Sequence, residues 1–292
     1  MTEHRVTTAD GRVLQVLEAG HPTGRPVLVH NGTPNSRLLF GRDVARAERQ
    51  GIRLISYDRP GYGGSTPRPG RTVGHCAEDV RAIAASLDIE RLAVWGISGG
   101  GPHAIACAAL LPELVPAVAV LASPAPWKAS GLDYFAGMGQ LNVDDTLLML
   151  EDPVAARAQR ERDRLDMLAI TPEALLELLS TLLSPTDAAA LTGELAEYLV
   201  DASRSGLAPG WQGWWDDDVA FLTPWGFELD SIRTPVLLHH GREDRFVPFG
   251  HGQWLSRHIP GVQAELTEDD GHLTLTTRHL DDVHAWLLER LG

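Results

Sequence analysis

The sequence has few cysteines, no surplus of positive charge and no long apolar run. Its 292 residues include two cysteines, Cys76 and Cys107, which argues against a disulfide framework and favours a reducing compartment. Because cysteine and histidine do not cluster along the chain, we expect no structural zinc site, and we expect no cofactor. The formal net charge is −14, whereas a protein that binds nucleic acid needs clustered lysine and arginine.

The sequence also lacks the usual signs of export or membrane insertion. The first ten residues contain no apolar segment of the signal-peptide kind, and no apolar run is long enough to cross a bilayer. We therefore expect a cytoplasmic protein that binds neither membrane nor nucleic acid and acts on a small molecule. Its oligomeric state cannot be inferred from the sequence.

Short apolar segments alternate with helical patterns in both end regions of the chain. We expect strands at 27–30, 52–57, 92–95, 117–121, 236–239 and 264–267, and helices at 42–50, 73–87, 103–111, 250–258 and 277–291. A hairpin of residues 6–8 and 13–18 precedes them, with Asp-Gly in its turn. This alternation predicts an α/β fold with a mostly parallel sheet flanked by helices.

The alternation stops between residues 127 and 230. Helices are expected there at 153–169, 172–183 and 186–202, because each of these segments has a proline near its start. We therefore predict an α/β core made of residues 1–126 and 231–292. An inserted helical cap would consist of residues 127–230.

The stretch Gly96-Ile97-Ser98-Gly99-Gly100 has the G-x-S-x-G pattern between an expected strand and an expected helix. A sharp turn from strand to helix needs a strained backbone, and the two outer glycines remove side chains that would clash there. Such a turn holds the serine hydroxyl exposed at the end of the sheet, as in a nucleophile elbow. Ser98 is therefore predicted to be a nucleophile.

The loops after the last two expected strands contain candidates for an acid and a base. Glu243 and Asp244 follow strand 236–240, and His272 follows strand 264–267. The carboxyl ends of parallel strands share one edge of the sheet, where ligand sites lie. His272 could therefore act as a general base oriented by Glu243 or by Asp244.

Two backbone amides are candidates for an oxyanion hole. Thr33 lies in the turn-rich loop after strand 27–30, and Gly99 follows the nucleophile directly. Removing one such donor typically costs about 2.7–4 kcal/mol of transition-state stabilisation.

Five stretches together resemble a known family. They are Asn31–Pro34, Asp58–Ser65, Gly96–Gly100, Gly241–Pro248 and Gly271–His272, and they occur in the family's order across the predicted core. The chain resembles the α/β-hydrolase superfamily, in the form of a serine hydrolase with a helical cap. Many relatives have His-Gly before the oxyanion residue, whereas this chain has Asn31-Gly32.

The resemblance implies a role for each candidate. Ser98 would be the nucleophile, His272 the general base and Asp244 the acid of the triad, because the family's acid commonly precedes Val-Pro as Asp244 does. The amides of Thr33 and Gly99 would form the oxyanion hole.

Serine at the elbow favours acyl transfer. Relatives that open epoxides or displace halide have aspartate at this position, so those reactions are not expected. A carboxylesterase acting on a small hydrophobic compound is the leading hypothesis. Aminopeptidase or amidase activity, lactone opening and C–C bond hydrolysis remain alternatives, as does a non-catalytic ligand receptor.

Four tryptophans lie in the last part of the expected cap, at Trp211, Trp214, Trp215 and Trp225. A cap inserted between strands 117–121 and 236–240 emerges above Ser98, so it can roof the site. The tryptophans are expected either to pack the cap or to line the pocket. If one lines the pocket, the substrate should have a compact hydrophobic or aromatic group.

Overall fold

Eight strands form a single sheet in the computed structural model, which describes residues 1–191 and 193–292. The strands are β1 (Thr2–Thr7), β2 (Val13–Gly20), β3 (Arg25–His30), β4 (Ile52–Tyr57), β5 (Ala93–Ile97), β6 (Val118–Leu121), β7 (Val236–Gly241) and β8 (Gln263–Thr267). Their order in space is β1-β2-β4-β3-β5-β6-β7-β8. All pairs from β4 to β8 are parallel, and β2 is antiparallel to both of its neighbours. The predicted α/β fold is confirmed.

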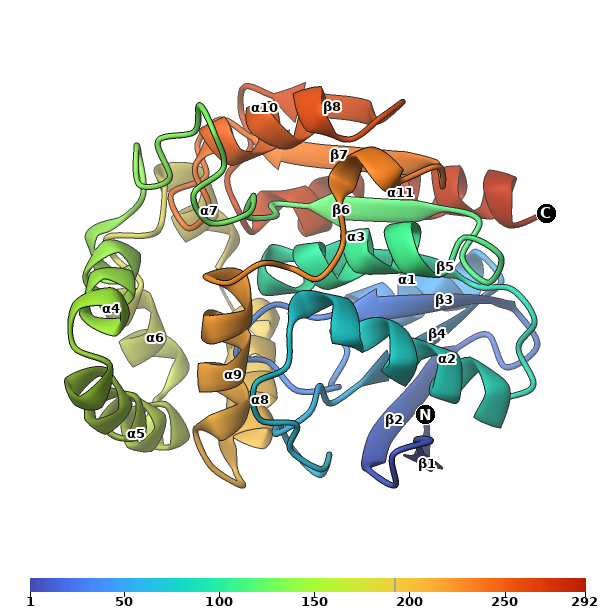
Figure 1. Cartoon of the computed structure of the whole chain (residues 1–292), viewed down its shortest axis with the longest axis horizontal. Helices are drawn as coiled ribbons and strands as arrows, with labels where there is room; N and C mark the ends of the chain where they lie inside the picture. Colours follow the sequence, from blue (N-terminus) through green and yellow to red (C-terminus); the bar gives the residue numbers. More distant parts are fainter. Residues whose placement is uncertain (192) are drawn as a thin grey trace.

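Helices cover both faces of the sheet (Figure 1). The helices of the core are α1 (Gly41–Arg49), α2 (Cys76–Ser86), α3 (Gly101–Leu110), α10 (Phe249–His258) and α11 (Thr274–Leu291). One apolar cluster joins the sheet to α2, α3 and α10, and a second joins its other face to α1 and α11. This burial on both faces explains why the parallel strands are continuous apolar runs in the sequence.

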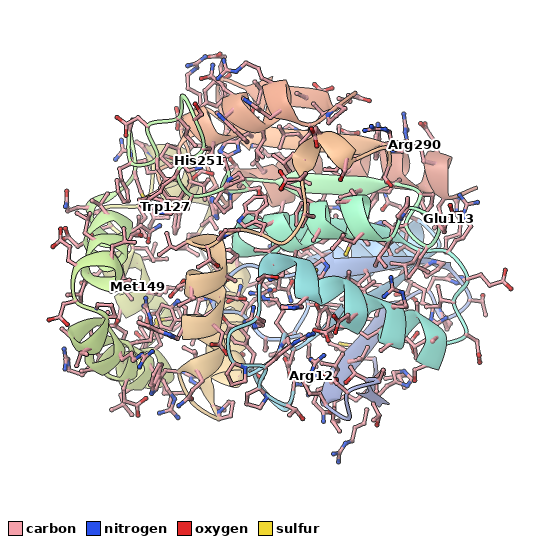
Figure 2. All side chains as sticks on the ribbon, viewed as in Figure 1. Arg12, Glu113, Trp127, Met149, His251 and Arg290 are labelled. Carbon is pink, nitrogen blue, oxygen red and sulfur yellow. The ribbon has the colours of Figure 1, made fainter. Side chains whose placement is uncertain are left out.

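Six α-helices of the described residues lie between β6 and β7, at one end of the sheet, where the cap is predicted (Figure 1). They are α4 (Gln140–Glu151), α5 (Pro153–Ala169), α6 (Pro172–Leu178), α7 (Pro185–Ala190), α8 (Glu194–Leu207) and α9 (Gln212–Phe221). Side chains fill the region of the cap, with Met149 among its helices and Arg290 at the opposite end of the molecule (Figure 2). None of the helices in the described part of the chain is long and apolar enough to cross a membrane.

The prolines mark the helix starts as predicted. Helices α5, α6 and α7 each begin at a proline, and the preceding residues Asp152, Thr171 and Ser184 accept hydrogen bonds from backbone amides of the first turn. Proline suits this position because the first N–H groups of a helix have no partner within it. The boundaries of the cap at 127 and 230 stay a prediction.

The structure differs from the prediction in four places within the cap. Helices α4 and α9 were not predicted, and the expected helix 172–183 ends at Leu178. The expected helix 186–202 consists of two helices, α7 and α8, with Gly193 between them at φ 48°. A left-handed glycine interrupts a helix, and the run Asp216-Asp217-Asp218 in α9 has low helix propensity.

Six of the seven buried histidines each make the fold less stable at acid pH. They are His30, His103, His239, His240, His251 and His284, and burial lowers the pKa of each below its ordinary 6.5. The pKa is about 3 for His103 and about 4 for His251 and His284. Above pH 6.5 these side chains are neutral in both states. Below pH 6.5 the unfolded chain binds protons that the folded chain does not. The contribution of these histidines to the free energy of unfolding therefore decreases as the pH is lowered.

We therefore expect His284→Gln to be more stable relative to the wild type at pH 5 than at pH 7.5, by about 2 kcal/mol, because the folded pKa of His284 is about 4. The comparison is made with the wild type because buried carboxyls act in the opposite direction. Burial raises the pKa of Asp43 and of Asp218 to about 7, so both stabilise the fold as the pH is lowered. Calorimetry at constant ionic strength measures both proteins, and an equal pH dependence of their melting temperatures would contradict the effect of the buried histidine.

Candidate active site

The turn from β5 into α3 has the strained geometry expected of an elbow. Ser98 has φ 54°, a left-handed conformation that is rare for residues other than glycine. A Cβ atom on Gly96 would overlap the carbonyl oxygen of Gly100 and lie 3.0 Å from Ala104 Cβ. A Cβ atom on Gly100 would overlap the carbonyl oxygen of His30. Both glycines are therefore required by the close approach of backbone segments around Ser98.

Asp244 and His272 are joined by a buried hydrogen bond. His272 Nδ1 lies 2.8 Å from Asp244 Oδ2, and the two residues are 5% and 3% exposed. The other oxygen of Asp244 accepts hydrogen bonds from the amides of Phe246 and Val247, both at 2.9 Å. This arrangement fixes the carboxylate, which in turn fixes the imidazole so that Nε2 is left to act as a base.

Glu243 points to a different partner. Its carboxylate accepts a hydrogen bond from Thr186 Oγ1 of the cap at 2.6 Å. Of the two adjacent carboxylates, the structure therefore brings Asp244 to the histidine.

Asp244 also changes the acid–base behaviour of His272. Burial lowers the pKa of His272, but the charge of Asp244 and its hydrogen bond outweigh burial and raise the pKa above 6.5. Phe246 stacks on the imidazole with ring centroids 4.5 Å apart. No hydrogen bond joins Ser98 Oγ to His272 within the described residues; such catalytic contacts often tighten only when substrate binds.

The loop of Gly32 and Thr33, which is the predicted oxyanion loop, lies against the elbow. A Cβ atom on Gly32 would lie 3.4 Å from Ser98 Cβ, and one on Gly99 would overlap Thr33 Oγ1. The structure thus brings Thr33 and Gly99 together beside the serine. The amide N–H of Thr33 donates no hydrogen bond to any residue in 1–191 or 193–292, so it is free to bind an oxyanion.

The comparison with known families matches this geometry. The family model described as alpha/beta hydrolase fold matches residues 25–278. The chain belongs to the α/β-hydrolase family. The match includes the elbow, the oxyanion loop and the loops that contain Asp244 and His272.

Three curated relatives cover most of this hydrolase. The AB hydrolase superfamily protein YisY of Bacillus subtilis is 26% identical over 275 residues, which is 92% of each chain. A 2-hydroxy-6-oxononadienedioate/2-hydroxy-6-oxononatrienedioate hydrolase of Cupriavidus pinatubonensis is 25% identical over 93% of this chain and 89% of its own length. The bifunctional esterase/perhydrolase DCH of Acinetobacter calcoaceticus is 26% identical over 84% and 83%, respectively.

The four tryptophans of the hydrolase lie in different surroundings. Trp211 packs edge-on against Trp215, and Trp214 lies under the Arg160 guanidinium at 4.0 Å from the ring centroid. Trp225 is 4% exposed and belongs to the apolar cluster between the sheet and helices α2 and α3. These contacts pack the protein. A role for any of the four in substrate binding stays a prediction.

Phe221 is a pocket candidate that the sequence did not reveal. A Cβ atom on Gly99 would lie 3.2 Å from Phe221 Cζ, so this ring at the end of α9 lies beside the predicted oxyanion hole. It also packs edge-on against His103. Its position depends on α9, which was not predicted as a helix, so no local signal in the sequence could have found it.

Possible metal ligands meet near the elbow. A ring nitrogen of His30 and the sulfurs of Cys76 and Cys107 all lie within 4.8 Å of one another, and all three residues are buried. The sequence suggested no such cluster because the three are far apart in the chain. Closed structural zinc sites have four ligands, and a zinc-bound histidine normally donates its other N–H.

The His30 group lacks those features. Within the described residues His30 Nδ1 has no hydrogen-bond partner, and burial raises the pKa of the Cys76 thiol well above its usual value. Cys107 Sγ lies 3.5 Å from His30 Nε2. The cluster is therefore better described as a contact between uncharged side chains than as a metal site. The expectation of no metal and no cofactor stays a prediction.

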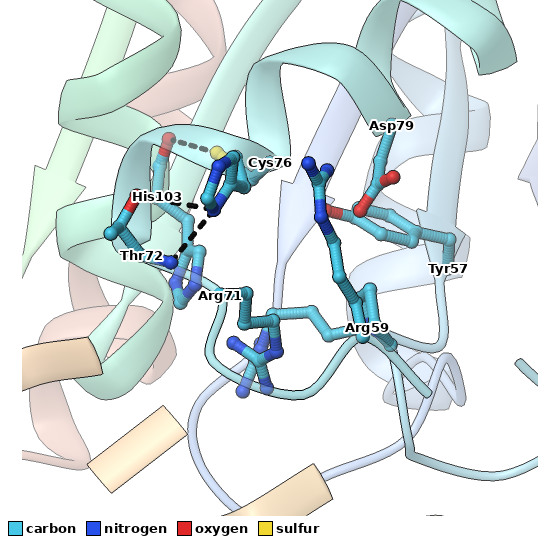
Figure 3. A pocket seen from close by; sticks show the side chains of 10 residues that line it. Tyr57, Arg59, Arg71, Thr72, Cys76, Asp79 and His103 are labelled. Carbon is cyan, nitrogen blue, oxygen red and sulfur yellow. Dashed lines mark hydrogen bonds between the residues drawn. The ribbon is translucent and has the colours of Figure 1, made fainter. Parts of the chain in front are cut away.

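A small cavity lies beside this cluster (Figure 3). Cys76 and Asp79 enter it from α2, and Arg59 and Arg71 enter it from loops. It has room for about one water molecule. The three triad candidates do not line it, so it is not the substrate pocket.

The raised pKa of His272 predicts how activity depends on pH. A protonated imidazole cannot accept the serine proton, so kcat/KM should fall tenfold per unit on the acid side of a single pKa above 6.5. Initial rates from about pH 5 to 9 measure the profile. A flat profile over that range would contradict a histidine base.

Proposed function

We propose that the protein is a serine hydrolase that cleaves a carboxylic ester of a small hydrophobic compound through an acyl-enzyme. Ser98 is the nucleophile, His272 the general base and Asp244 the residue that orients it. The amides of Thr33 and Gly99 form the oxyanion hole.

The hydrogen bond between His272 and Asp244 supports this proposal most directly. A buried acid and histidine at the same edge of the sheet as a left-handed Ser98 are the parts that acyl transfer requires. The free amide of Thr33 beside the serine adds a donor where negative charge develops.

The reaction then follows from the placement of these groups. His272 Nε2 takes the proton of Ser98 as Oγ attacks the carbonyl carbon, and the carbonyl oxygen becomes an oxyanion held by the two amides. The tetrahedral intermediate expels the alcohol, which leaves with the proton from His272. Water, activated by the same histidine, attacks the acyl-enzyme and releases the acid.

Two observations bear on the substrate. One relative is named an esterase/perhydrolase, which supports an ester. Phe221 places an aromatic ring beside Gly99, which supports a compact apolar acyl group rather than a long flexible chain. A second candidate is hydrolysis of a dienedioate, because another relative is named for that activity.

A substrate screen with active-site labelling tests the proposal. The purified protein is assayed with esters of graded acyl length, aryl esters, lactones, amino-acid amides and a 2-hydroxy-6-oxo dienedioate. We expect the highest kcat/KM for esters with short or aromatic acyl groups. We also expect one phosphonate adduct per chain, located at Ser98 by mass spectrometry.

Higher kcat/KM for the dienedioate, a lactone or an amide would shift the substrate class but keep the serine mechanism. A protein that neither turns over any of these compounds nor reacts with the phosphonate would overturn the proposed function. Tight binding without turnover would instead support a ligand receptor.

A further inference from the structure

A carboxylate from the cap is buried in the core beside the oxyanion loop. Asp217 belongs to α9 and is fully buried. Its oxygens accept hydrogen bonds from four side chains, namely Arg59 at 2.6 Å, Arg71 at 2.5 Å, Tyr62 at 2.9 Å and Thr33 at 3.0 Å. The cap and the oxyanion loop are therefore bonded to each other through one carboxylate.

Arg59 makes the second half of this connection. The same guanidinium that binds Asp217 donates to the carbonyl oxygen of Asn31 at 2.5 Å and to Thr33 Oγ1 at 3.0 Å. Thr33 Oγ1 thus accepts from Arg59 and donates to Asp217. These bonds hold the loop on both sides of Gly32, so the orientation of the free Thr33 amide depends on them.

The helix that contains Asp217 is itself fixed. Arg71 donates to the carbonyl oxygen of Gly213 in α9 at 3.0 Å, and a Cβ atom on Gly213 would lie 2.6 Å from the backbone of Gly61. Burial raises the pKa of Asp217, but Arg59 and Arg71 lower it far below its usual range, so the carboxylate is charged. A charged, fully bonded group of this kind has one position rather than several.

A second cap carboxylate binds the loop of the catalytic base. Asp187 belongs to α7 and is fully buried. It accepts hydrogen bonds from the amides of His272 at 2.8 Å, Leu273 at 2.7 Å and Thr274 at 3.3 Å. A Cβ atom on Gly271 would overlap its carboxylate. Asp187 therefore fits closely against the start of α11 and the loop before it, which contains His272.

We propose that Asp217 and Asp187 are positioning residues through which the cap sets the geometry of catalysis in the core. Asp217 holds the oxyanion loop, and Asp187 holds the loop of the general base. This inference rests on the proposed serine-hydrolase function. Neither carboxylate touches the reacting atoms, so each acts through the residues that it holds.

The two residues should have different kinetic signatures. Loss of Asp217 should impair stabilisation of the oxyanion, and so lower kcat and the affinity for a boronic acid that mimics the tetrahedral intermediate. Loss of Asp187 removes a negative charge near His272. The other titratable groups that face His272 are Asp244, from the loop after β7, and His240, from β7.

The first test compares Asp217→Asn with Asp216→Asn, a matched change in the preceding residue of α9. Rates are expressed per site titrated with the phosphonate, which removes the effect of unfolded protein. For Asp217→Asn we expect kcat to fall about 10–100-fold with KM little changed, and boronate affinity to fall in parallel. The pH midpoint of kcat/KM should stay where it is in the wild type.

Thr33→Val provides a second route if Asp217→Asn does not fold. It keeps the Thr33 amide and all charges but removes the hydroxyl that bonds Arg59 and Asp217. It should show the same loss of kcat and boronate affinity, and Thr33→Ser, which keeps the hydroxyl, should restore both.

Asp187→Asn tests the role proposed for the second carboxylate. Its acid-limb midpoint should move to lower pH, because the charge of Asp187 contributes to the raised pKa of His272. Hydrogen exchange should increase in residues 270–274 in this variant, and in residues 31–36 in Asp217→Asn.

The failures of the two proposals can be told apart. A wild-type protein that neither turns over substrate nor reacts with the phosphonate overturns the proposed function. If the wild type is active and both Asp217→Asn and Thr33→Val have its kcat per titrated site, only the role of Asp217 is overturned. Unchanged pH midpoints in Asp187→Asn overturn the role of Asp187.

Discussion

Replacing Ser98 by alanine is expected to lower kcat by about 10⁵–10⁶-fold on the preferred ester. The residue is the one side chain held at the elbow in a left-handed conformation, and no neighbouring group supplies another nucleophile in the G-x-S-x-G turn. Loss of a triad nucleophile in other serine hydrolases has an effect of this size, because the triad acts as a unit. Steady-state kinetics and phosphonate labelling measure the two consequences together.

The matched control is Ser180→Ala, which changes an exposed serine of the cap. It should keep both the wild-type rate and the single adduct. Alanine keeps the Cβ atom of serine and loses only the hydroxyl. Ser98→Ala should therefore retain the wild-type melting temperature within a few degrees. Labelling that persists in Ser98→Ala would show that another residue is the nucleophile.

Asp244→Asn is expected to lower kcat by up to about 10⁴-fold. The asparagine keeps the shape, but its amide can donate toward His272 Nδ1, which favours the tautomer with the proton on Nε2. That imidazole cannot take the proton of Ser98. The raised pKa of His272 also depends chiefly on Asp244 among nearby charges, so the acid limb of any residual activity should move to lower pH.

Glu243→Gln is the control for Asp244→Asn, because it makes the same chemical change one residue away. Its carboxylate bonds Thr186 rather than His272, so the loss should be less than about tenfold, in line with a polar contact at the edge of the cap. A larger loss in Glu243→Gln than in Asp244→Asn would reverse the assignment of the acid.

The catalytic elbow could be predicted because its signals are local. A strand, five residues of turn and a helix are contiguous in the chain, and the close approaches of Gly96 and Gly100 confirm why those positions have no side chain. The positions of the strands and of the hairpin follow from the same kind of evidence. The closeness of Thr33 and Gly99 could be inferred for the same reason, since one follows a strand and the other follows Ser98; their role as an oxyanion hole stays a prediction.

The choice between Glu243 and Asp244 could not be made from residue types alone. Both are carboxylates on one loop, and the family resemblance favoured Asp244. The structure gives the physical reason: one oxygen of Asp244 binds the amides of its own loop, which leaves the other for His272. The preference for Asp244 therefore depends on the folded conformation of residues 244–247.

The contacts of Asp217 and Asp187 with the core could not be predicted because they join residues far apart in the sequence. Asp216-Asp217-Asp218 resembles a solvated acidic run, which is the usual fate of three adjacent aspartates. Arg59 and Arg71, which pair with Asp217, lie about 150 residues earlier in the chain. The same holds for Asp187, which meets the His272 loop 85 residues later.

The pairing of core arginines with a cap aspartate limits how this enzyme can be altered. Cap exchange between related hydrolases is an obvious way to change specificity, in the laboratory or in evolution. Here a foreign cap without a carboxylate at the position of Asp217 would leave Arg59 and Arg71 buried without a counter-charge. Breaking a buried ion pair in this way costs about 3–5 kcal/mol. The cap is therefore not an interchangeable module, and any lineage that replaces it must retain the aspartate or lose both arginines with it.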